Sequence, residues 1–179
     1  MKLSAAEVEE FFTRGFLVKE GLFAEEELEP MREAFARLHA ESQGLGALTG
    51  IHRGAQFVFE GQHLHRVVWA GAIEASLLRV AEDPRLLAVA AQLLGSQEVV
   101  QLLNQCHFKL PGDGVAFAWH QDSQNRHYGT PDWTDVNGRG SFVQSILAVD
   151  PTPAESGHLE VYPGSCQAGH LGLSGDEAE

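Results

Sequence analysis

Lysine is scarce in this 179-residue chain, and the net charge is strongly negative. Only three lysines occur, Lys2, Lys19 and Lys109, and 25 acidic residues face 12 Lys and Arg residues, which gives a formal net charge of −13 at pH 7. A surface that binds nucleic-acid phosphates needs an excess of Lys and Arg. The composition therefore argues against a nucleic-acid partner.

Long apolar runs and cysteines are also rare. No apolar run approaches the ~18 residues that a membrane-spanning helix needs, and the N-terminus turns acidic too early for a signal peptide. The two cysteines, Cys106 and Cys166, do not make a disulfide framework. We therefore expect a cytoplasmic protein with no membrane partner. The sequence leaves its oligomeric state open.

The length and composition are those of one globular domain. At 179 residues the chain can bury a sizeable core, and its hydrophobic content of 44% and charged content of 21% are ordinary. Helix signals fill the first half of the chain and strand signals the second. We interpret residues 1–179 as a single domain, with a mainly helical part at 1–97 and a β-core part at 98–179.

Capping patterns mark the helices of the first half. Ser4 and Glu7 form a capping-box pattern at the start of a short helix. A second helix is predicted from Ala24, with Pro30 within its first turn. Asp83 is a candidate N-cap for a later helix, which Gly95 ends. Apolar residues at steps of three and four give the second helix one apolar face: Leu28, Met31, Phe35 and Leu38.

Strand signals are concentrated after residue 98. Strands are predicted at 99–110, 140–149 and 159–162, and one earlier strand at 15–19, whereas the Gly- and Gln-rich residues 42–65 are expected to be less regular. Helices that precede strands favour an α+β layout, with helices packed on an antiparallel β core.

The run Ala-Trp-His-Gln-Asp-Ser, residues 118–123, holds the most informative pattern in the chain. On an extended segment, side chains two positions apart point the same way, so His120 and Asp122 can grip one ion. A His and a carboxylate are two of the three ligands in the 2-His-1-carboxylate triad of non-haem Fe(II). Alone, the pattern also fits a surface His and Asp in a polar loop.

Further motifs surround this pattern in a fixed order. They are Gln-Cys-His-Phe-Lys-Leu-Pro-Gly at 105–112, Trp-His-Gln-Asp at 119–122, Ala-Val-Asp at 148–150, and Glu-Ser-Gly-His-Leu-Glu-Val-Tyr-Pro-Gly-Ser at 155–165. In this order they resemble the phytanoyl-CoA dioxygenase family of Fe(II)/2-oxoglutarate oxygenases. The resemblance runs from about residue 7 to about residue 171. Several weak motifs in the right order are more specific than His-x-Asp alone.

The resemblance implies a double-stranded β-helix, a jelly roll with iron at one open end and N-terminal helices packed on it. It implies that His120 and Asp122 are two of the iron ligands and that Gln121 lines the 2-oxoglutarate site. Gln105 and Lys109 fall on a strand face that approaches the same cosubstrate. The implied cofactors are Fe(II), 2-oxoglutarate and dioxygen. A carboxylate ligand leaves no room for halide on the metal, so the implied reaction is hydroxylation of a small or medium organic substrate.

Other interpretations stay open for the polar side chains. Lys109 also fits a solvated cation at a strand end, and Gln105 fits an ordinary polar residue at a barrel mouth. His107 shares their strand face and can line the same cavity. His63 and His65 form another pair on one face, but no carboxylate is near, so a strand or substrate-pocket role is expected there.

The chain departs from the family pattern after the Pro-Gly-Ser motif. The family's third iron ligand is a later His, and a later Arg pairs with the far carboxylate of 2-oxoglutarate. Neither has a counterpart before Glu179, so we interpret the C-terminal strands as truncated. His170 follows the Pro-Gly turn too closely to be expected as the third ligand. The sequence therefore also allows a non-catalytic binding or structural module, or a cupin-like protein that uses His120 and Asp122 for another metal.

Overall fold

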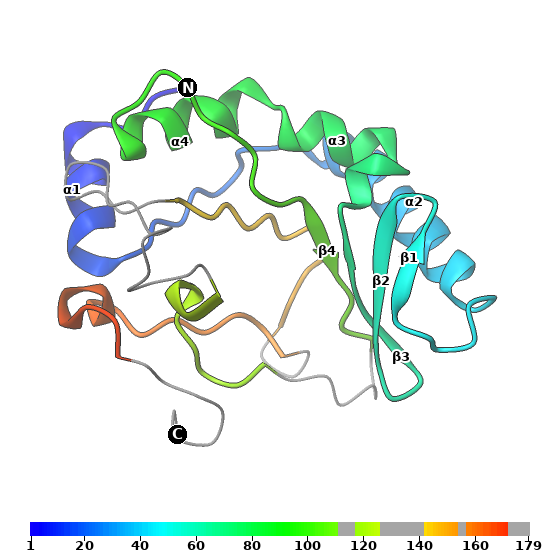
Figure 1. Cartoon of the computed structure of the whole chain (residues 1–179). Coiled ribbons are helices and arrows are strands. Elements are labelled where there is room, and N and C mark those ends of the chain that lie inside the picture. Colours follow the sequence, from blue (N-terminus) through cyan, green and yellow to red (C-terminus); the bar gives the residue numbers. More distant parts are fainter. Residues whose placement is uncertain (111–116, 126–141, 154–156, 172–179) are drawn as a thin grey trace.

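Helices and one four-stranded antiparallel sheet make up the regular part of the described structure (Figure 1). The structure is a computed structural model, and it describes residues 1–110, 117–125, 142–153 and 157–171. The α-helices are α1 (Ala5–Arg14), α2 (Glu25–Ser42), α3 (Ala75–Ala81) and α4 (Pro84–Leu94). The short 3-10 helices are η1 (Ala70–Ala72), η2 (Asp122–Asn125) and η4 (Ser165–Ala168). The strands are β1 (Gly50–His52), β2 (Ala55–Glu60), β3 (His63–Val68) and β4 (Gln105–His107).

Local sequence signals fix the ends of α1 and α4. The Ser4 hydroxyl accepts the Glu7 N–H, and the Glu7 carboxylate accepts the Ser4 N–H at 2.7 Å, so both halves of the capping box form. The Asp83 side chain accepts the Arg85 N–H at the start of α4, and Gly95 ends that helix with a left-handed φ of 68°. These predictions are confirmed.

Pro30 lies inside α2, so its predicted place in the first turn is wrong. The helix begins at Glu25, where the Glu27 carboxylate reaches back to accept the Ala24 N–H at 2.8 Å. Proline removes the hydrogen bond to the carbonyl four residues earlier, which belongs to Glu26. Both Glu26 and Pro30 are exposed, so water can reach that carbonyl.

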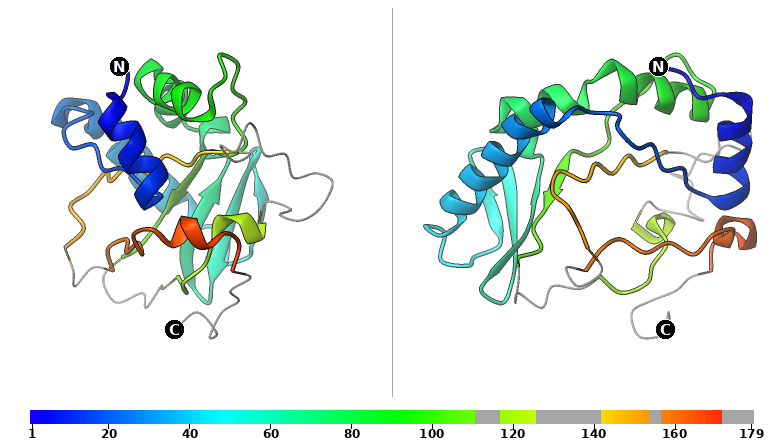
Figure 2. Two further views of the ribbon diagram at one scale, coloured as in Figure 1. Left: turned by 90° about the vertical axis from the view of Figure 1, so that its left-hand side faces the viewer. Right: turned by 180° about the vertical axis from the view of Figure 1, so that it is seen from behind.

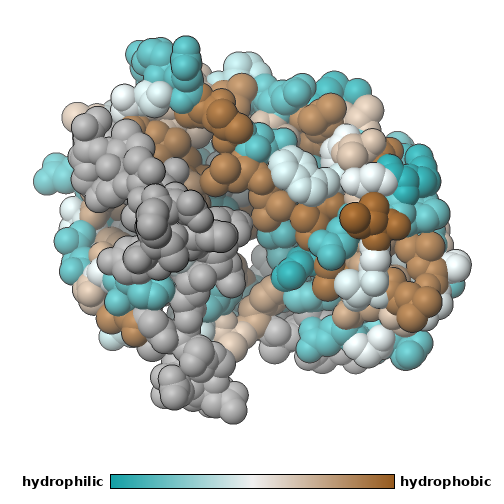
Figure 3. Space-filling view, viewed as in Figure 1, coloured by the Kyte–Doolittle hydropathy of each residue, from teal (hydrophilic) through white to brown (hydrophobic). Residues whose placement is uncertain are grey.

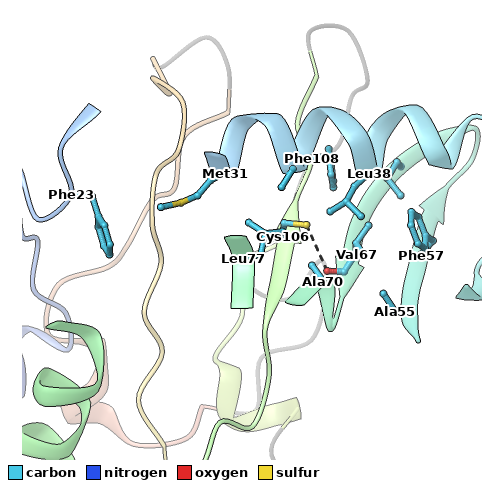
Figure 4. Close-up of a cluster of buried hydrophobic side chains, with 12 residues drawn as sticks. Phe23, Met31, Leu38, Ala55, Phe57, Val67, Ala70, Leu77, Cys106 and Phe108 are labelled. Carbon is cyan, nitrogen blue, oxygen red and sulfur yellow. Dashed lines mark hydrogen bonds between the residues drawn. The ribbon is translucent and has the colours of Figure 1, made fainter. Parts of the chain in front are cut away.

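The sheet has the order β1-β2-β3-β4, and every neighbouring pair is antiparallel. One of its faces packs against α2 (Figures 1 and 2). In the close-up, Leu38 of α2 lies against Val67 and Phe57 of the sheet, and these three side chains are fully buried (Figure 4). Cys106 of β4 joins the same core, with its Sγ 3.9 Å from the Val67 carbonyl oxygen. This packing fixes the position of β4.

The sheet lies earlier in the chain than predicted. Strands β1 to β3 all fall within residues 50–68, mostly in the segment expected to be less regular. In the described structure, residues 15–19, 142–149 and 159–162 belong to no strand, which contradicts the predicted strands there. A strand needs a partner elsewhere in the chain, and alternation of side chains does not identify that partner.

The α+β class is confirmed by this combination of helices and antiparallel sheet. The predicted strand at 99–110 is reduced to β4. The described residues contain a single sheet, so a jelly roll of two sheets stays a prediction, as does the single domain with parts at 1–97 and 98–179. None of the described helices has the length and apolar character needed to cross a membrane.

Large apolar side chains also reach the surface outside the core. Val100 is 85% exposed, Ile51 81% and Tyr162 74%. Figure 3 shows apolar patches interspersed with polar residues on the face seen in Figure 1. Exposed apolar residues are common on folded proteins, so this surface by itself assigns no partner.

Candidate metal-binding site

His120 and Asp122 lie side by side in the segment 117–125. The His120 Nε2 and Asp122 Oδ1 atoms are 3.5 Å apart, and the two side chains are 44% and 37% exposed. Asp122 is the first residue of η2, and His120 belongs to no strand in the described structure, so the extended segment assumed for the pair is not observed. The two side chains nevertheless approach each other just before and at the start of η2.

A backbone contact orients the imidazole of His120. Its Nδ1 atom lies 2.7 Å from the Ala118 carbonyl oxygen. A carbonyl oxygen only accepts hydrogen bonds, so Nδ1 carries a proton, and the neutral tautomer with this bond has its lone pair on Nε2. Metal-bound histidines commonly use one nitrogen for the metal while the other donates to the protein. Nε2, the nitrogen nearer Asp122, is thus the one available to a metal ion.

The spacing of the pair fits two ligands of one transition-metal ion. Ligands bound at ~2.0–2.2 Å and separated by angles of roughly 90–120° lie about 2.8–3.8 Å apart. The observed 3.5 Å falls within this range. Across the described ranges, no group of three or more His, Cys, Asp or Glu side chains is arranged to hold a metal. This part of the chain therefore offers two side chains of the kinds that a facial triad uses, and their role as ligands stays a prediction.

We call His120 and Asp122, the candidate metal ligands, the metal pair. The two residues that alternate with them, Gln121 and Ser123, bind a segment near the end of the described chain. The Gln121 Nε2 donates to the Gly169 carbonyl at 2.8 Å, and its Oε1 accepts the Leu171 N–H at 2.6 Å. The Ser123 Oγ lies 2.7 Å from the His170 Nδ1. The structure thus places the Gln121 amide against the backbone of residues 169–171 and brings His170 to Ser123, the residue after Asp122. The expected role of Gln121 at the 2-oxoglutarate site stays a prediction.

Gln105, His107 and Lys109 alternate along β4 and its continuation, as predicted. The two residues between them are buried in the core against α2, so this set lies on the opposite side of the strand. The Lys109 ammonium donates to the Gly157 carbonyl at 2.7 Å. The cosubstrate-binding roles of Gln105 and Lys109 stay predictions.

A cluster of three rings, His65, His107 and Phe117, covers this side of β4. The ring centroids of His65 and His107 are 6.2 Å apart, and that of Phe117 lies 4.6 Å and 5.3 Å from them respectively. The Lys109 Nζ lies 5.4 Å from the Phe117 centroid. Sequence reasoning placed His107 on this face but missed Phe117, whose one signal is its position three residues before His120. We call these three residues the ring cluster.

Comparison with known proteins matches residues 11–171 to the phytanoyl-CoA dioxygenase (PhyH) family. The chain belongs to this family. The match covers the helical first part, β4 and the segment that carries His120 and Asp122. The resemblance inferred from the order of the motifs is therefore confirmed.

The relatives of this phytanoyl-CoA dioxygenase family member include named dioxygenases and a hydroxylase. Ectoine dioxygenase from Bordetella parapertussis is 30% identical over 167 residues, which cover 91% of this chain and 49% of the relative. For ectoine dioxygenase from Halomonas elongata the values are 27%, 91% and 46%. L-proline trans-4-hydroxylase from Streptomyces griseoviridis is 34% identical over 91 residues, 51% of this chain and 32% of the relative. The chain thus spans about half the length of the ectoine dioxygenases. No solved structure matches it significantly.

In this family member, the charge of the metal pair acts on the ring cluster. Burial of the ring, helped by the nearby His65, Arg66 and Lys109, lowers the pKa of His107 to about 4. The negative charge of Asp122 acts in the opposite direction. Burial likewise lowers the pKa of His65. Part of His107 reaches solvent, yet both imidazoles are neutral at pH 7. The ring cluster lies close enough to Asp122 for the carboxylate charge to affect the pKa of His107.

Lowering the pH from about 7.5 to about 5 is expected to destabilise the protein through these two imidazoles. The unfolded chain takes up protons near the ordinary pKa of 6.5, whereas folded His107 resists protonation until about pH 4. The unfolded state therefore binds more protons in this window, so the free energy of unfolding falls as the pH falls. The Glu7 carboxyl, whose pKa is about 2 in the folded protein and 4.5 ordinarily, acts below this window.

Urea titrations at both pH values measure this effect. The drop in midpoint between the two pH values should be smaller for His107→Asn than for the wild type, because one of the two shifted imidazoles is gone. An equal drop in both proteins would contradict the lowered pKa of His107.

Proposed function

We propose that this chain carries the iron-binding part of an Fe(II)- and 2-oxoglutarate-dependent dioxygenase that hydroxylates a small or medium organic substrate. The main support is the His120–Asp122 pair, with Nε2 and Oδ1 3.5 Å apart, in a family whose named relatives are dioxygenases and a hydroxylase. When bound, Fe(II), 2-oxoglutarate and dioxygen supply the oxidising chemistry, and the protein supplies geometry and shelter from water.

His120 and Asp122 are the residues that would hold the ion. His120 would bind through Nε2 while its Nδ1–H stays with the Ala118 carbonyl, which keeps the ring from rotating. Asp122 would bind through its carboxylate and offset part of the positive charge of the ion. Because this carboxylate takes the coordination position that a halide would need, we propose hydroxylation and not halogenation.

The β4 face is our proposed cosubstrate side. The Lys109 ammonium supplies positive charge for a dicarboxylate, and the Gln105 amide supplies hydrogen-bond donors. Lys109 now donates to the Gly157 carbonyl, so a carboxylate would have to compete with that oxygen. Phe117, with the two neutral imidazoles of the ring cluster, adds apolar surface that limits the access of water to this side.

A small-molecule substrate agrees with the relatives and with the composition. Ectoine and L-proline, the compounds in the names of the relatives, are both small organic molecules. The net charge of −13 disfavours nucleic acid as a partner. We propose the cytoplasm as the place of action.

The proposal is tested by a succinate assay on the purified chain. With Fe(II), ascorbate and dioxygen present, we expect 2-oxoglutarate to be converted to succinate in a reaction that needs iron and is lost in His120→Ala. Binding of Mn(II), followed by electron paramagnetic resonance, should weaken in the same variant. Failure of the wild type in both measurements would overturn the proposal. Metal binding without succinate would support a non-catalytic binding module instead.

A further inference from the structure

Side chains, not strand pairing, hold the segment 117–125 in place. Within the described structure this segment belongs to no ladder, and its only regular element is η2. Between and after the two ligand candidates stand Gln121 and Ser123, which carry the hydrogen bonds to residues 169–171. We call Gln121, Ser123 and His170 the loop clamp.

The carboxamide of Gln121 binds two backbone groups of the segment 169–171. Its Nε2 donates to the Gly169 carbonyl at 2.8 Å, and its Oε1 accepts the Leu171 N–H at 2.6 Å. One side chain therefore satisfies two backbone groups at once. Because Gln121 lies between His120 and Asp122 in the sequence, its anchoring restricts the backbone of both.

His170 completes the clamp from the opposite segment. Its Nδ1 lies 2.7 Å from the Ser123 Oγ, and the residue itself lies between the two backbone groups that Gln121 binds. A side chain from each segment thus reaches across to the other. His170 thus uses Nδ1 to hold Ser123, and no described group of three metal-ligating side chains includes it.

The backbone conformation of Gly169 allows its carbonyl to bind Gln121. Gly169 follows η4 with φ 71° and ψ −155°, a region of backbone conformation that is essentially restricted to glycine. This conformation lets the chain leave η4 and present the Gly169 carbonyl to Gln121. Any other residue at position 169 would strain the backbone, even though no atom lies within 4 Å of the position that its Cβ would take.

We propose that Gln121, Ser123 and His170 are positioning residues that hold His120 and Asp122 in the geometry needed to bind a metal ion. The inference rests on the proposed function, which makes His120 and Asp122 metal ligands. It adds that contacts with residues 169–171 hold these two ligands in place. Groups that orient metal ligands typically change metal affinity by about 10- to 100-fold when they are removed.

Mn(II) binding by the purified chain tests the positioning role. Gln121→Ala, Ser123→Ala and His170→Ala should each weaken Mn(II) binding roughly tenfold. The double variant of Ser123 and His170 should bind no more weakly than either single variant, because both remove the same contact. His170→Asn, whose amide can still pair with the Ser123 hydroxyl, should recover part of the affinity. If Ser123→Ala binds like the wild type while His170→Ala binds poorly, His170 is a ligand and the proposal is wrong.

Amide hydrogen exchange of Leu171, followed by nuclear magnetic resonance, tests the clamp without a metal. The Leu171 N–H should be protected in the wild type and in Gln101→Ala, a control at an exposed glutamine, and should lose protection in Gln121→Ala. Fast exchange already in the wild type would overturn the clamp. If the wild type binds no Mn(II), the proposed function fails together with the positioning role. Protection of Leu171 then decides only whether the two segments are joined.

Discussion

Replacing Asp122 with asparagine is expected to abolish the iron-dependent turnover of 2-oxoglutarate while leaving the fold intact. The amide keeps the size of the carboxylate but loses its charge. Among the described residues, His120 would then be the one remaining candidate ligand of the pair. We expect Fe(II) affinity to fall at least about a hundredfold, since even groups that only orient ligands can cost that much. The partly exposed side chain should change the free energy of unfolding by less than ~0.5 kcal/mol. Succinate assays and urea titrations measure the two effects.

The chain contains a matched control for this substitution. His158 and Glu160 also stand two positions apart, and the His158 Nε2 to Glu160 Oε1 distance is 3.5 Å, the same as in the metal pair. Glu160→Gln therefore removes one charge from a second His-x-carboxylate pair that lacks the surrounding Trp-His-Gln-Asp motif. This variant should keep iron-dependent turnover. If Glu160→Gln abolished turnover and Asp122→Asn did not, the iron site would have to be moved to residues 157–162.

The elements that the sequence predicted well are those whose determinants are local. The capping box of Ser4 and Glu7 spans four residues, and the stop at Gly95 depends on the conformation of one residue. The error at Pro30 has a local cause as well. The Glu27 carboxylate caps α2 at Ala24, which places the first turn before the proline.

The sheet could not be located because its pairing is set by distant parts of the chain. β3 pairs with β4 about 40 residues later, with Val67 opposite Cys106, and this register exists because both side chains enter the core against α2. Alternating residues near 140–149 and 159–162 satisfy the pattern of a strand equally well, yet they form no ladder in the described structure. Alternation describes a half-buried surface, and the partner strand decides whether a ladder forms.

In the candidate site too, local contacts could be predicted from the sequence and contacts between distant residues could not. The approach of His120 to Asp122 follows from a separation of two residues, so the sequence revealed it. The contact of Phe117 with His65 joins residues far apart in the chain, as does the contact of Ser123 with His170. Neither contact leaves a local signal. The contacts that surround the metal pair could therefore be found only in the three-dimensional structure.

Truncating Phe57 to alanine is expected to have the largest effect on stability. Phe57 is fully buried on β2 and packs in the cluster between the sheet and α2. Its removal loses a large apolar side chain and leaves a cavity, which together cost about 3–5 kcal/mol in protein cores. Typical domains have a free energy of unfolding of only about 5–15 kcal/mol. Because β2 supports β3 and β3 pairs with β4, this loss should also loosen the face that carries Lys109.

Ile51→Ala provides the control for the same sheet, measured by urea titration alongside Phe57→Ala. Ile51 lies on β1, next to the position opposite Phe57, but it is 81% exposed, so its truncation should change the free energy of unfolding by less than ~0.5 kcal/mol. Similar costs at the two positions would show that the core does not lie between α2 and the sheet. We expect a large loss of unfolding free energy in Phe57→Ala alone. If folded Phe57→Ala also binds Mn(II) more weakly, at urea concentrations too low to unfold it, the packing of this core affects the metal pair through β4 and the ring cluster.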